Sequence, residues 1–269
     1  MHPFLSFCGI TIPSYGAMIV LGVISALGLG CLTSLRRGLD VNSFIATAGY
    51  GMLGGILGAK LLYILTNVRI VEWDRLLDPA YAYGLLHPSG FVVMGGLVAG
   101  LLFIALGSYI HDLHSFSLMQ HLIFILPLCQ GVGRIGCYLA GCCYGISYEG
   151  WGAVSFPHYS FAGDGYRFPV QLLSASILFA QALVLYGLSH TRFRSHNLYV
   201  YVLMYTLSRF FTEFLRGDDA ERAFRQFPSQ SQMLCMMIGG IFLLILIIKK
   251  CRQSRRLRLC LNCRENGST

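Results

Sequence analysis

Residues 15–34 read YGAMIVLGVISALGLGCLTS, a run without a charged side chain. A helix needs about 20 apolar residues to cross a bilayer core that is about 30 Å thick. The run is followed by Arg36 and Arg37, and a pair of cations in this position holds one end of a membrane helix on the cytoplasmic side. The stretch therefore predicts a transmembrane helix.

Six more apolar stretches of similar length follow. They cover roughly 44–66, 91–110, 117–138, 170–189, 197–215 and 230–248. We therefore predict an all-α polytopic membrane protein with seven transmembrane helices in residues 1–249 and a basic tail over 250–269. The composition agrees, because 55% of the residues are hydrophobic and 12% are charged, against about 25% charged in soluble domains. It excludes a disordered chain, a nucleic-acid-binding domain and a secreted disulfide scaffold.

The distribution of charge predicts the orientation of the helices. An odd number of spans puts the two termini on opposite sides of the membrane. Most of the net charge of +8 lies in the tail from Lys249 onward, which holds seven basic residues and one acidic residue. With the tail inside, that face carries eleven Lys and Arg residues, and the opposite loops carry six. The positive-inside rule then places the N-terminus outside and the C-terminus in the cytoplasm.

Three cations fall inside predicted spans, namely Lys60, Arg134 and Arg209. Each costs about 2.5–3.5 kcal/mol at the middle of a membrane, so three together indicate a function. In the predicted orientation all three lie toward the outer ends of their helices. Glu213 and Arg216 follow Arg209 at i+4 and i+7, on the same helix face. We expect these groups to converge at one depth, although snorkelling cations or a structural ion-pair network remain alternatives.

Small and aromatic residues accompany these cations. Tyr15 and the pair Gly95–Gly96 also fall on the outer side, because their spans begin there. Gly133 and Gly136 flank the arginine of the fourth span and leave the backbone open to a ligand. A guanidinium group grips a phosphodiester with paired donors. The predicted ligand is an outer-leaflet phospholipid headgroup.

Glycines at four-residue spacing occur in the second and third predicted spans. Residues 51–58 hold two overlapping G-x-x-x-G patterns, and Gly96 and Gly100 repeat the pattern. This spacing allows two membrane helices to pack closely. We expect it to bring Lys60 near Gly95.

The stretch GVGRIGCYLAGCCYG (131–145) resembles the G-R-I-G-N-F-x-N-G-E-x-x-G signature of prolipoprotein diacylglyceryl transferases. Other stretches match this family in the same order, and together they cover nearly the whole chain. They are SYG (14–16), GGILGAKLLYIL (54–65), MGGLVAG (94–100), FPVQLL (168–173), RFFTEFLR (209–216) and SQSQMLCM (229–236).

The resemblance implies a multi-pass enzyme of the bacterial inner membrane. It would move a diacylglyceryl group from phosphatidylglycerol to the lipobox cysteine thiol of a preprolipoprotein, releasing glycerol phosphate, without a metal or organic cofactor. The implied partners are phosphatidylglycerol, the preprolipoprotein signal peptide and membrane lipid, and no nucleic acid. By position, Arg134 and Arg209 would hold the lipid phosphate, Tyr15 would line the site, and Glu213 and Arg216 would complete the polar cluster. Substrate binding is assigned to Arg134, Lys60, Gly95, Gly96, Gly133, Gly136 and Cys142.

The chain departs from the family pattern at three positions. Met94 stands where the family has a histidine, and a thioether cannot accept a proton. Cys137 replaces the Asn of the signature and Cys142 replaces its Glu. His87 is a candidate substitute base. The departures leave two alternatives open: a phospholipid-binding protein without catalysis, or a relative with a different acceptor. A transporter is a third class, although no repeated halves are visible.

The cysteines Cys137, Cys142 and Cys143 sit beside the predicted lipid-binding arginine. They could include an enzyme thiol that takes the lipid first, form a redox-sensitive pair, or be structural. A cation nearby would favour a thiolate. Cys260 and Cys263 form one C-x-x-C in the tail, but a structural zinc site needs a second pair of ligands, so no metal is predicted there.

Overall fold

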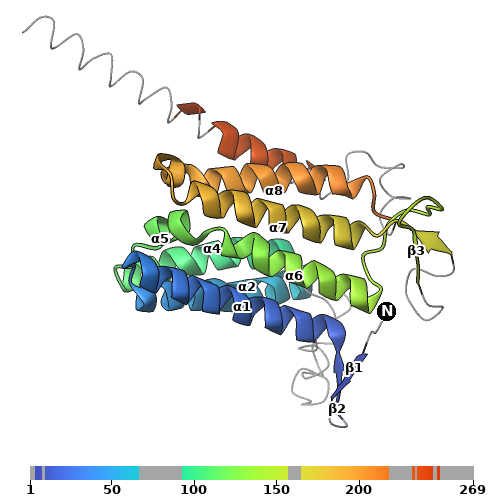
Figure 1. Ribbon diagram of the computed structural model, residues 1–269. Helices are drawn as coiled ribbons and strands as arrows, with labels where there is room; N and C mark the ends of the chain where they lie inside the picture. Colours follow the sequence, from blue (N-terminus) through green and yellow to red (C-terminus); the bar gives the residue numbers. More distant parts are fainter. Residues whose placement is uncertain are drawn as a thin grey trace, which may run out of the picture. The chain divides into compact units, whose positions relative to one another are not determined.

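The computed structural model describes residues 4–7, 10–66, 93–156, 165–217, 232–233, 235–244 and 247–248. The chain divides into two compact units. One unit comprises Met1–Ala26 with Gln120–Thr269, and the other comprises Leu27–Met119. Helices make up most of both units (Figure 1). We call these the site unit and the glycine unit, respectively.

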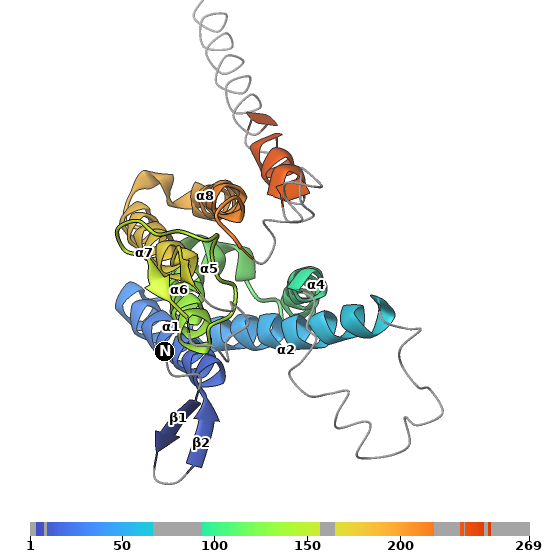
Figure 2. The ribbon, with the colours of Figure 1, turned by 90° about the vertical axis from the view of Figure 1, so that its right-hand side faces the viewer.

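The glycine unit is built on the contact between α2 (Val41–Thr66) and α4 (Val93–Ile110). The two helices lie against each other (Figure 2). They meet through the glycines predicted to pack. A Cβ atom added to Gly54 would lie 2.6 Å from the carbonyl oxygen of Ala99, and one added to Gly58 would overlap Gly95 and Ala99. The predicted close packing of these two helices is confirmed. Gly95 lies within α4.

The turn before α2 is fixed by a side-chain cap. Asp40 accepts hydrogen bonds from the backbone N–H groups of Asn42 (3.0 Å) and Ser43 (3.1 Å). These are donors that the first turn of a helix leaves without a backbone partner. The hydrogen bond from the Ser43 side chain, followed by that from the Asn42 backbone, lowers the pKa of Asp40.

A small hydroxyl network lies elsewhere in the glycine unit. The Ser115 hydroxyl, at the start of α5 (Ser115–Leu122), lies 2.8 Å from that of Thr47 and 2.7 Å from that of Ser108. Buried hydroxyl groups need such partners, because leaving one unsatisfied in an apolar medium costs several kcal/mol, on the order of 2–7. The network therefore links α2, α4 and α5 by polar contacts.

The predicted span 117–138 is not one straight helix. α5 and α6 (Ile125–Ala140) are separate and bent by 60° at the break between them. Pro127 lies in the first turn of α6, where the missing N–H group costs no hydrogen bond but where the ring disfavours continuation of the preceding helix. The prediction of a continuous helix is wrong here because it counted hydrophobicity alone.

In the site unit, α7 (Val170–Leu188) packs between α6 and α8 (Asn197–Glu213). Buried amides join these helices. Gln181 on α7 donates to the carbonyl oxygen of Met204 and to the Ser208 hydroxyl, both at 3.0 Å. Tyr201 donates to the side chain of Gln130 on α6 at 3.0 Å. Such hydrogen bonds fix the orientation of neighbouring membrane helices whose other contacts are apolar.

Short strands were not predicted from the sequence. β1 (Phe4–Phe7) pairs antiparallel with β2 (Ile10–Pro13), directly before α1 (Ser14–Arg37). β3 (Val154–Ser155) pairs with β4 (Tyr166–Arg167) in the segment between α6 and α7. A short 3-10 helix, Arg192–His196, connects α7 to α8. The fold is therefore mostly helical, with two small hairpins.

Within the described residues, three helices are long and apolar enough to cross a membrane. These are Ser14–Arg37, Val41–Leu65 and Val170–Leu188, and the bent pair α5–α6 can count as a fourth span. Val98–Ile110 and Cys235–Leu244 are shorter apolar helices. The molecule has the character of a polytopic membrane protein. The predicted tail over 250–269 lies outside the described residues.

Candidate functional site

The end of α6 turns the chain back on itself. Gly141 adopts the left-handed conformation, with φ at 72°, and its N–H group donates to the carbonyl oxygen of Tyr138. The N–H group of Cys142 donates to the carbonyl oxygen of Cys137 at 3.1 Å. These two bonds form a Schellman motif, which glycine allows because it has no Cβ. The motif folds Cys142 back over Cys137.

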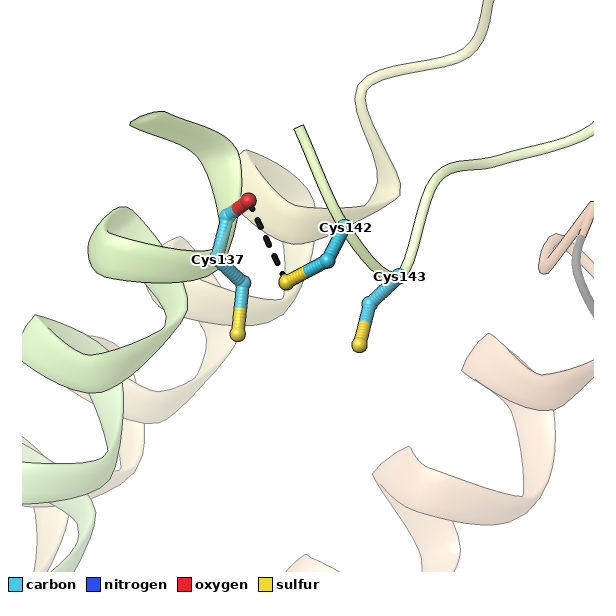
Figure 3. A group of neighbouring side chains, drawn as sticks. All are labelled: Cys137, Cys142 and Cys143. Carbon is cyan, nitrogen blue, oxygen red and sulfur yellow. Dashed lines mark hydrogen bonds between the residues drawn. The ribbon is translucent and has the colours of Figure 1, made fainter. Parts of the chain in front are cut away.

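Three cysteines gather at this turn (Figure 3). Each sulfur of Cys137, Cys142 and Cys143 lies within 4.8 Å of the others. The Cys142 thiol also donates to the Cys137 carbonyl oxygen at 3.7 Å. Gln171 on α7, which is fully buried, donates to the carbonyl oxygen of Cys142 at 2.9 Å. Cys143 itself has φ at 55°, an uncommon conformation for a residue with a side chain. Its position is therefore set by the surrounding backbone.

The loop after the cysteines is tied to the end of α8. Gly145 pairs with Arg216 in an antiparallel bridge, and the N–H group of Ile146 donates to the carbonyl oxygen of Leu215 at 3.1 Å. The N–H group of Gly217 donates to the carbonyl oxygen of Tyr144 at 2.9 Å. Gly145 cannot be replaced without displacement, because an added Cβ would overlap the Phe168 carbonyl. These backbone bonds hold Arg216 beside the cysteine loop.

A second group of charges lies on α8. Arg209 forms an ion pair with Glu213 at 2.8 Å, and the Glu213 side chain is buried. Arg209 also interacts electrostatically with Arg134 on α6 and with Arg216. Among the described residues, Arg209 therefore has the Glu213 carboxylate and two further guanidinium groups in its electrostatic environment.

Tyr15, at the start of α1, completes the cluster. A Cβ added to Gly136 would lie 3.5 Å from the Cα atom of Tyr15, so α1 lies directly against α6 at this point. The Tyr15 hydroxyl interacts electrostatically with Cys137 and with Arg134. Gly133, next to the arginine, has no described atom within 4 Å of an added Cβ. The backbone beside Arg134 is thus open in the described part of the chain.

The charges around the loop affect the acidity of Cys143. Hydrogen bonds with the thiols of Cys137 and Cys142 lower the pKa of Cys143 and outweigh the opposing effect of burial. The nearby Arg216 and Arg134 lower it further. Hydrogen bonds with its two neighbours raise the pKa of Cys142 instead. Cys143 therefore forms a thiolate more readily than Cys142.

Six predicted site residues, together with Gly133 and Gly136, belong to the site unit, and the other three belong to the glycine unit. Lys60, Gly95 and Gly96 belong to the glycine unit, so their participation stays a prediction. Lys60 is buried, with its ammonium nitrogen 5.0 Å from the centre of the Tyr63 ring. The six in the site unit are Tyr15, Arg134, Cys142, Arg209, Glu213 and Arg216.

Comparison with known proteins identifies the family. The model of the family described as prolipoprotein diacylglyceryl transferase matches residues 3–248. The chain belongs to this family. It is 36% identical over 239 residues to phosphatidylglycerol–prolipoprotein diacylglyceryl transferase 2 of Clostridium perfringens, covering 87% of this chain and 91% of that protein.

Two other relatives bear the same name without a number. The Clostridium tetani protein is 34% identical over 250 residues, covering 90% of this chain and 96% of its own. The Xanthomonas campestris protein is 28% identical over 264 residues, covering 88% and 86%. The family resemblance that the sequence motifs predict is therefore confirmed.

The departures from the family signature lie in two different places. Cys137 and Cys142, in place of Asn and Glu, meet in the sulfur group described above. Met94 lies in the first turn of α4, and its side chain is outside the described residues, as is the candidate base His87.

Sequence reasoning missed supporting residues that the tertiary structure reveals. Gln171 holds the cysteine turn, and its only signal was membership of the matching stretch 168–173. Arg167 places its guanidinium carbon 4.6 Å from the centre of the Tyr144 ring, beside the same loop. In the charge count, Arg167 contributes only as one of the six cations of the outer loops. Neither contact follows a helical spacing, so no sequence pattern could have found it.

Proposed function

We propose that this protein transfers a diacylglyceryl group from phosphatidylglycerol to the lipobox cysteine thiol of a prolipoprotein. Its membership of the family over residues 3–248 supports the reaction class. The observation that carries the proposal is the gathering of the Arg134 and Arg216 guanidinium groups near Arg209, which pairs with Glu213. Like charges at short range are unfavourable unless an anion offsets them. A lipid phosphate supplies that anion.

The chemistry requires a thiol to act as a thiolate. Its sulfur attacks the glyceryl carbon that carries the phosphate, the carbon–oxygen bond breaks, and glycerol phosphate departs. Negative charge develops on the departing phosphate. Guanidinium groups already in place stabilise it without reorganisation, an effect that typically amounts to a factor of about 100–1,000 per donor. We assign this role to Arg134 and Arg209, with Tyr15 lining the lipid and Glu213 orienting Arg209.

We further propose the predicted topology: seven spans, the N-terminus outside, the tail in the cytoplasm, and residence in the bacterial inner membrane. The three long apolar helices and the bent pair of the described residues support a chain that crosses the membrane several times, and the count of Lys and Arg on the two faces supports the proposed orientation. The site would then lie near the outer leaflet, where signal peptides with their acceptor cysteines emerge. The assignment of Lys60, Gly95 and Gly96 to lipid binding is part of this proposal.

The replacement of the family histidine by Met94 favours a second candidate, a phospholipid-binding protein without transferase activity. The two are separated by one assay. Purified protein is incubated with phosphatidylglycerol labelled in its terminal glycerol and with a lipobox peptide, and both released glycerol phosphate and lipidated peptide are measured. We expect both products in equal amounts.

The other outcomes of this assay are also informative. Release of glycerol phosphate without lipidated peptide would contradict the peptide as acceptor. Binding of phosphatidylglycerol with no release would contradict the transferase proposal and support the binding protein. Complementation of a host that lacks its own transferase provides the corresponding test in cells.

A further inference from the structure

The sulfur group at the end of α6 has the composition of a metal site. Cys137, Cys142 and Cys143 offer three sulfur ligands within 4.8 Å of one another. In a tetrahedral zinc site with metal–sulfur bonds of about 2.3 Å, the sulfurs lie about 3.8 Å apart. A closing movement of about 1 Å or less therefore brings these three atoms to coordination distance. The Cys142 and Cys143 side chains are half-buried and the Cys137 side chain is buried, so most of this movement falls to the first two.

The backbone prepares this arrangement. The Schellman motif folds Cys142 over Cys137, and Gln171 holds the Cys142 carbonyl from α7. Cys143 keeps an unusual positive φ that directs its side chain into the same group. The cost of this conformation, on the order of 1–3 kcal/mol, persists only where the surrounding structure imposes it. Conformations of this kind are typical of functional sites.

Two other roles for these thiols are less consistent with the chemistry. A covalent relay through an enzyme cysteine would form a thioether, and the thioether sulfur is a poor leaving group, so the lipid could not pass on to the acceptor. A disulfide would use two of the three sulfurs and leave the third without a role. A bound cation uses all three.

We propose that Cys137, Cys142 and Cys143 bind a soft divalent cation of the Zn²⁺ class, with a fourth coordination position open to the acceptor thiol. Thiolate ligands select zinc-like ions over Mg²⁺ and Ca²⁺. Three protein ligands with one open position are typical of catalytic zinc, whereas structural zinc has four. Among the described residues, the group contains three ligands and no fourth His, Cys, Asp or Glu.

The surrounding charges suit this occupant. Three thiolates with one divalent cation carry a net charge of −1. The Arg134 and Arg216 guanidinium groups, which interact electrostatically with Cys143, offset that charge. Buried charge without such compensation is strongly unfavourable.

The consequence for the reaction rests on the proposed transferase function. A thiol that coordinates a zinc ion loses its proton outright, which passes to water. The bound sulfur then attacks the glyceryl carbon of the lipid, whose phosphate is held by the neighbouring arginines. The carbon–sulfur bond forms as the carbon–oxygen bond breaks, and the neutral thioether leaves the metal as a weaker ligand. Activation of this kind needs no proton acceptor at Met94.

The first test measures metal binding alone. The full chain, with Cys251→Ser, Cys260→Ser and Cys263→Ser to remove the three thiols of the tail, is reduced in detergent, equilibrated with Zn²⁺ and dialysed. Metal content is determined by mass spectrometry, and Co²⁺ replaces Zn²⁺ for absorption spectra of sulfur-to-metal charge transfer. We expect one ion per chain. Separate substitution of Cys137, Cys142 and Cys143 by Ser should each weaken binding at least about tenfold.

Cys129→Ser is the matched control, because Cys129 lies on the same helix and outside the group. It should bind one ion, as the parent does. Absence of bound metal in the parent overturns the proposal, as does equal binding by the Cys143→Ser variant. A disulfide detected within the group of the protein as isolated would overturn it in favour of a redox pair.

The second test separates the metal from the transferase. Metal-free protein is assayed for lipidated peptide before and after addition of Zn²⁺. Restoration of transfer by at least about tenfold supports activation of the thiol. Bound metal with transfer that does not depend on it overturns the activating role alone. Bound metal with no transfer under any condition overturns the proposed function and leaves the metal site supported.

Discussion

At the scale of single residues, the positive charges of the site unit are held with different degrees of constraint. Arg209 has a carboxylate partner in Glu213, whereas Arg134 lies among glycines on α6, with open space beside Gly133. Arg216 is fixed through its backbone to the cysteine loop. Arg134 is therefore the group best placed to approach a ligand, and its removal should have the greatest effect.

We expect Arg134→Ala to reduce kcat/KM for glycerol phosphate release at least about 100-fold, because a donor to the departing phosphate is lost. Arg134→Lys should recover only part of the activity, since an ammonium group cannot form the paired contacts of a guanidinium group. The exposed Arg192, in the 3-10 helix before α8, is the control. Equal activity of Arg134→Ala and the parent would count against the site.

Lys60→Ala should have a smaller effect. A single ammonium group near an anionic lipid contributes about 1 kcal/mol, so we expect transfer to fall about fivefold. Lys60→Arg keeps the charge and should retain most activity. Phosphatidylglycerol titration of both variants distinguishes the outcomes, and a fall of the same size in both would indicate a role in packing against Tyr63 instead.

At the scale of elements, the helices are positioned by small residues and caps. The contact between α2 and α4 depends on glycines. At these positions a carbonyl group of one helix occupies the space that a side chain on the other helix would fill. The start of α2 depends on the carboxylate of Asp40. Both features can be tested by substitutions whose controls lie on the same helix.

Gly58→Val should destabilise the glycine unit. The new side chain would overlap Ala99 and the carbonyl group of Gly95, and forcing extra atoms into a packed contact costs about 1–3 kcal/mol. Gly49→Ala is the control, because an added Cβ there meets no described atom within 4 Å. Thermal unfolding in micelles should show a lower Tm for Gly58→Val and no loss for Gly49→Ala.

Removal of the Asp40 carboxylate should lower the melting temperature at neutral pH. The pKa of Asp40 is lowered in the folded protein, so its stabilising effect is present above the ordinary carboxyl pKa and is lost as the pH falls through the lowered value. The Tm difference between the parent and Asp40→Ala should therefore narrow at acidic pH. Asp40→Asn keeps an oxygen acceptor and should remain close to the parent at neutral pH. A difference independent of pH would contradict the cap.

At the scale of the whole molecule, orientation depends on charge at the end of the chain. Without the tail, four Lys and Arg residues would remain on the proposed inner face against six on the outer face. The positive-inside rule then no longer favours the proposed topology. We therefore predict that the tail decides the orientation of the membrane helices.

Reporter fusions test this. Alkaline phosphatase joined after residue 269, with the whole tail kept, should be inactive and green fluorescent protein at the same place should fluoresce, while phosphatase inserted after residue 152 should be active. Replacement of the basic residues at 250–258 by Gln should produce a mixed or inverted pattern. Active phosphatase at the tail of the parent would contradict the proposed orientation.

Much of the fold follows from local sequence. Apolar length predicts the spans, because each span must satisfy its own backbone in lipid. Glycine spacing predicts the α2–α4 contact, because two helices can approach closely only where side chains are absent. The Gly-Arg-Ile-Gly motif around Arg134, together with the other matching stretches, predicts the family.

The tertiary structure alone decided the break between α5 and α6, the two hairpins and the group of three sulfurs. Hydrophobicity is a sum over a stretch and does not register the turn imposed by Pro127. The group of sulfurs depends on the direction in which the chain leaves Gly141 and on a buried amide from a helix about 30 residues away. The spacing of residues along the sequence shows neither the direction of the chain nor the position of this amide. Both are set by the path of the backbone through space.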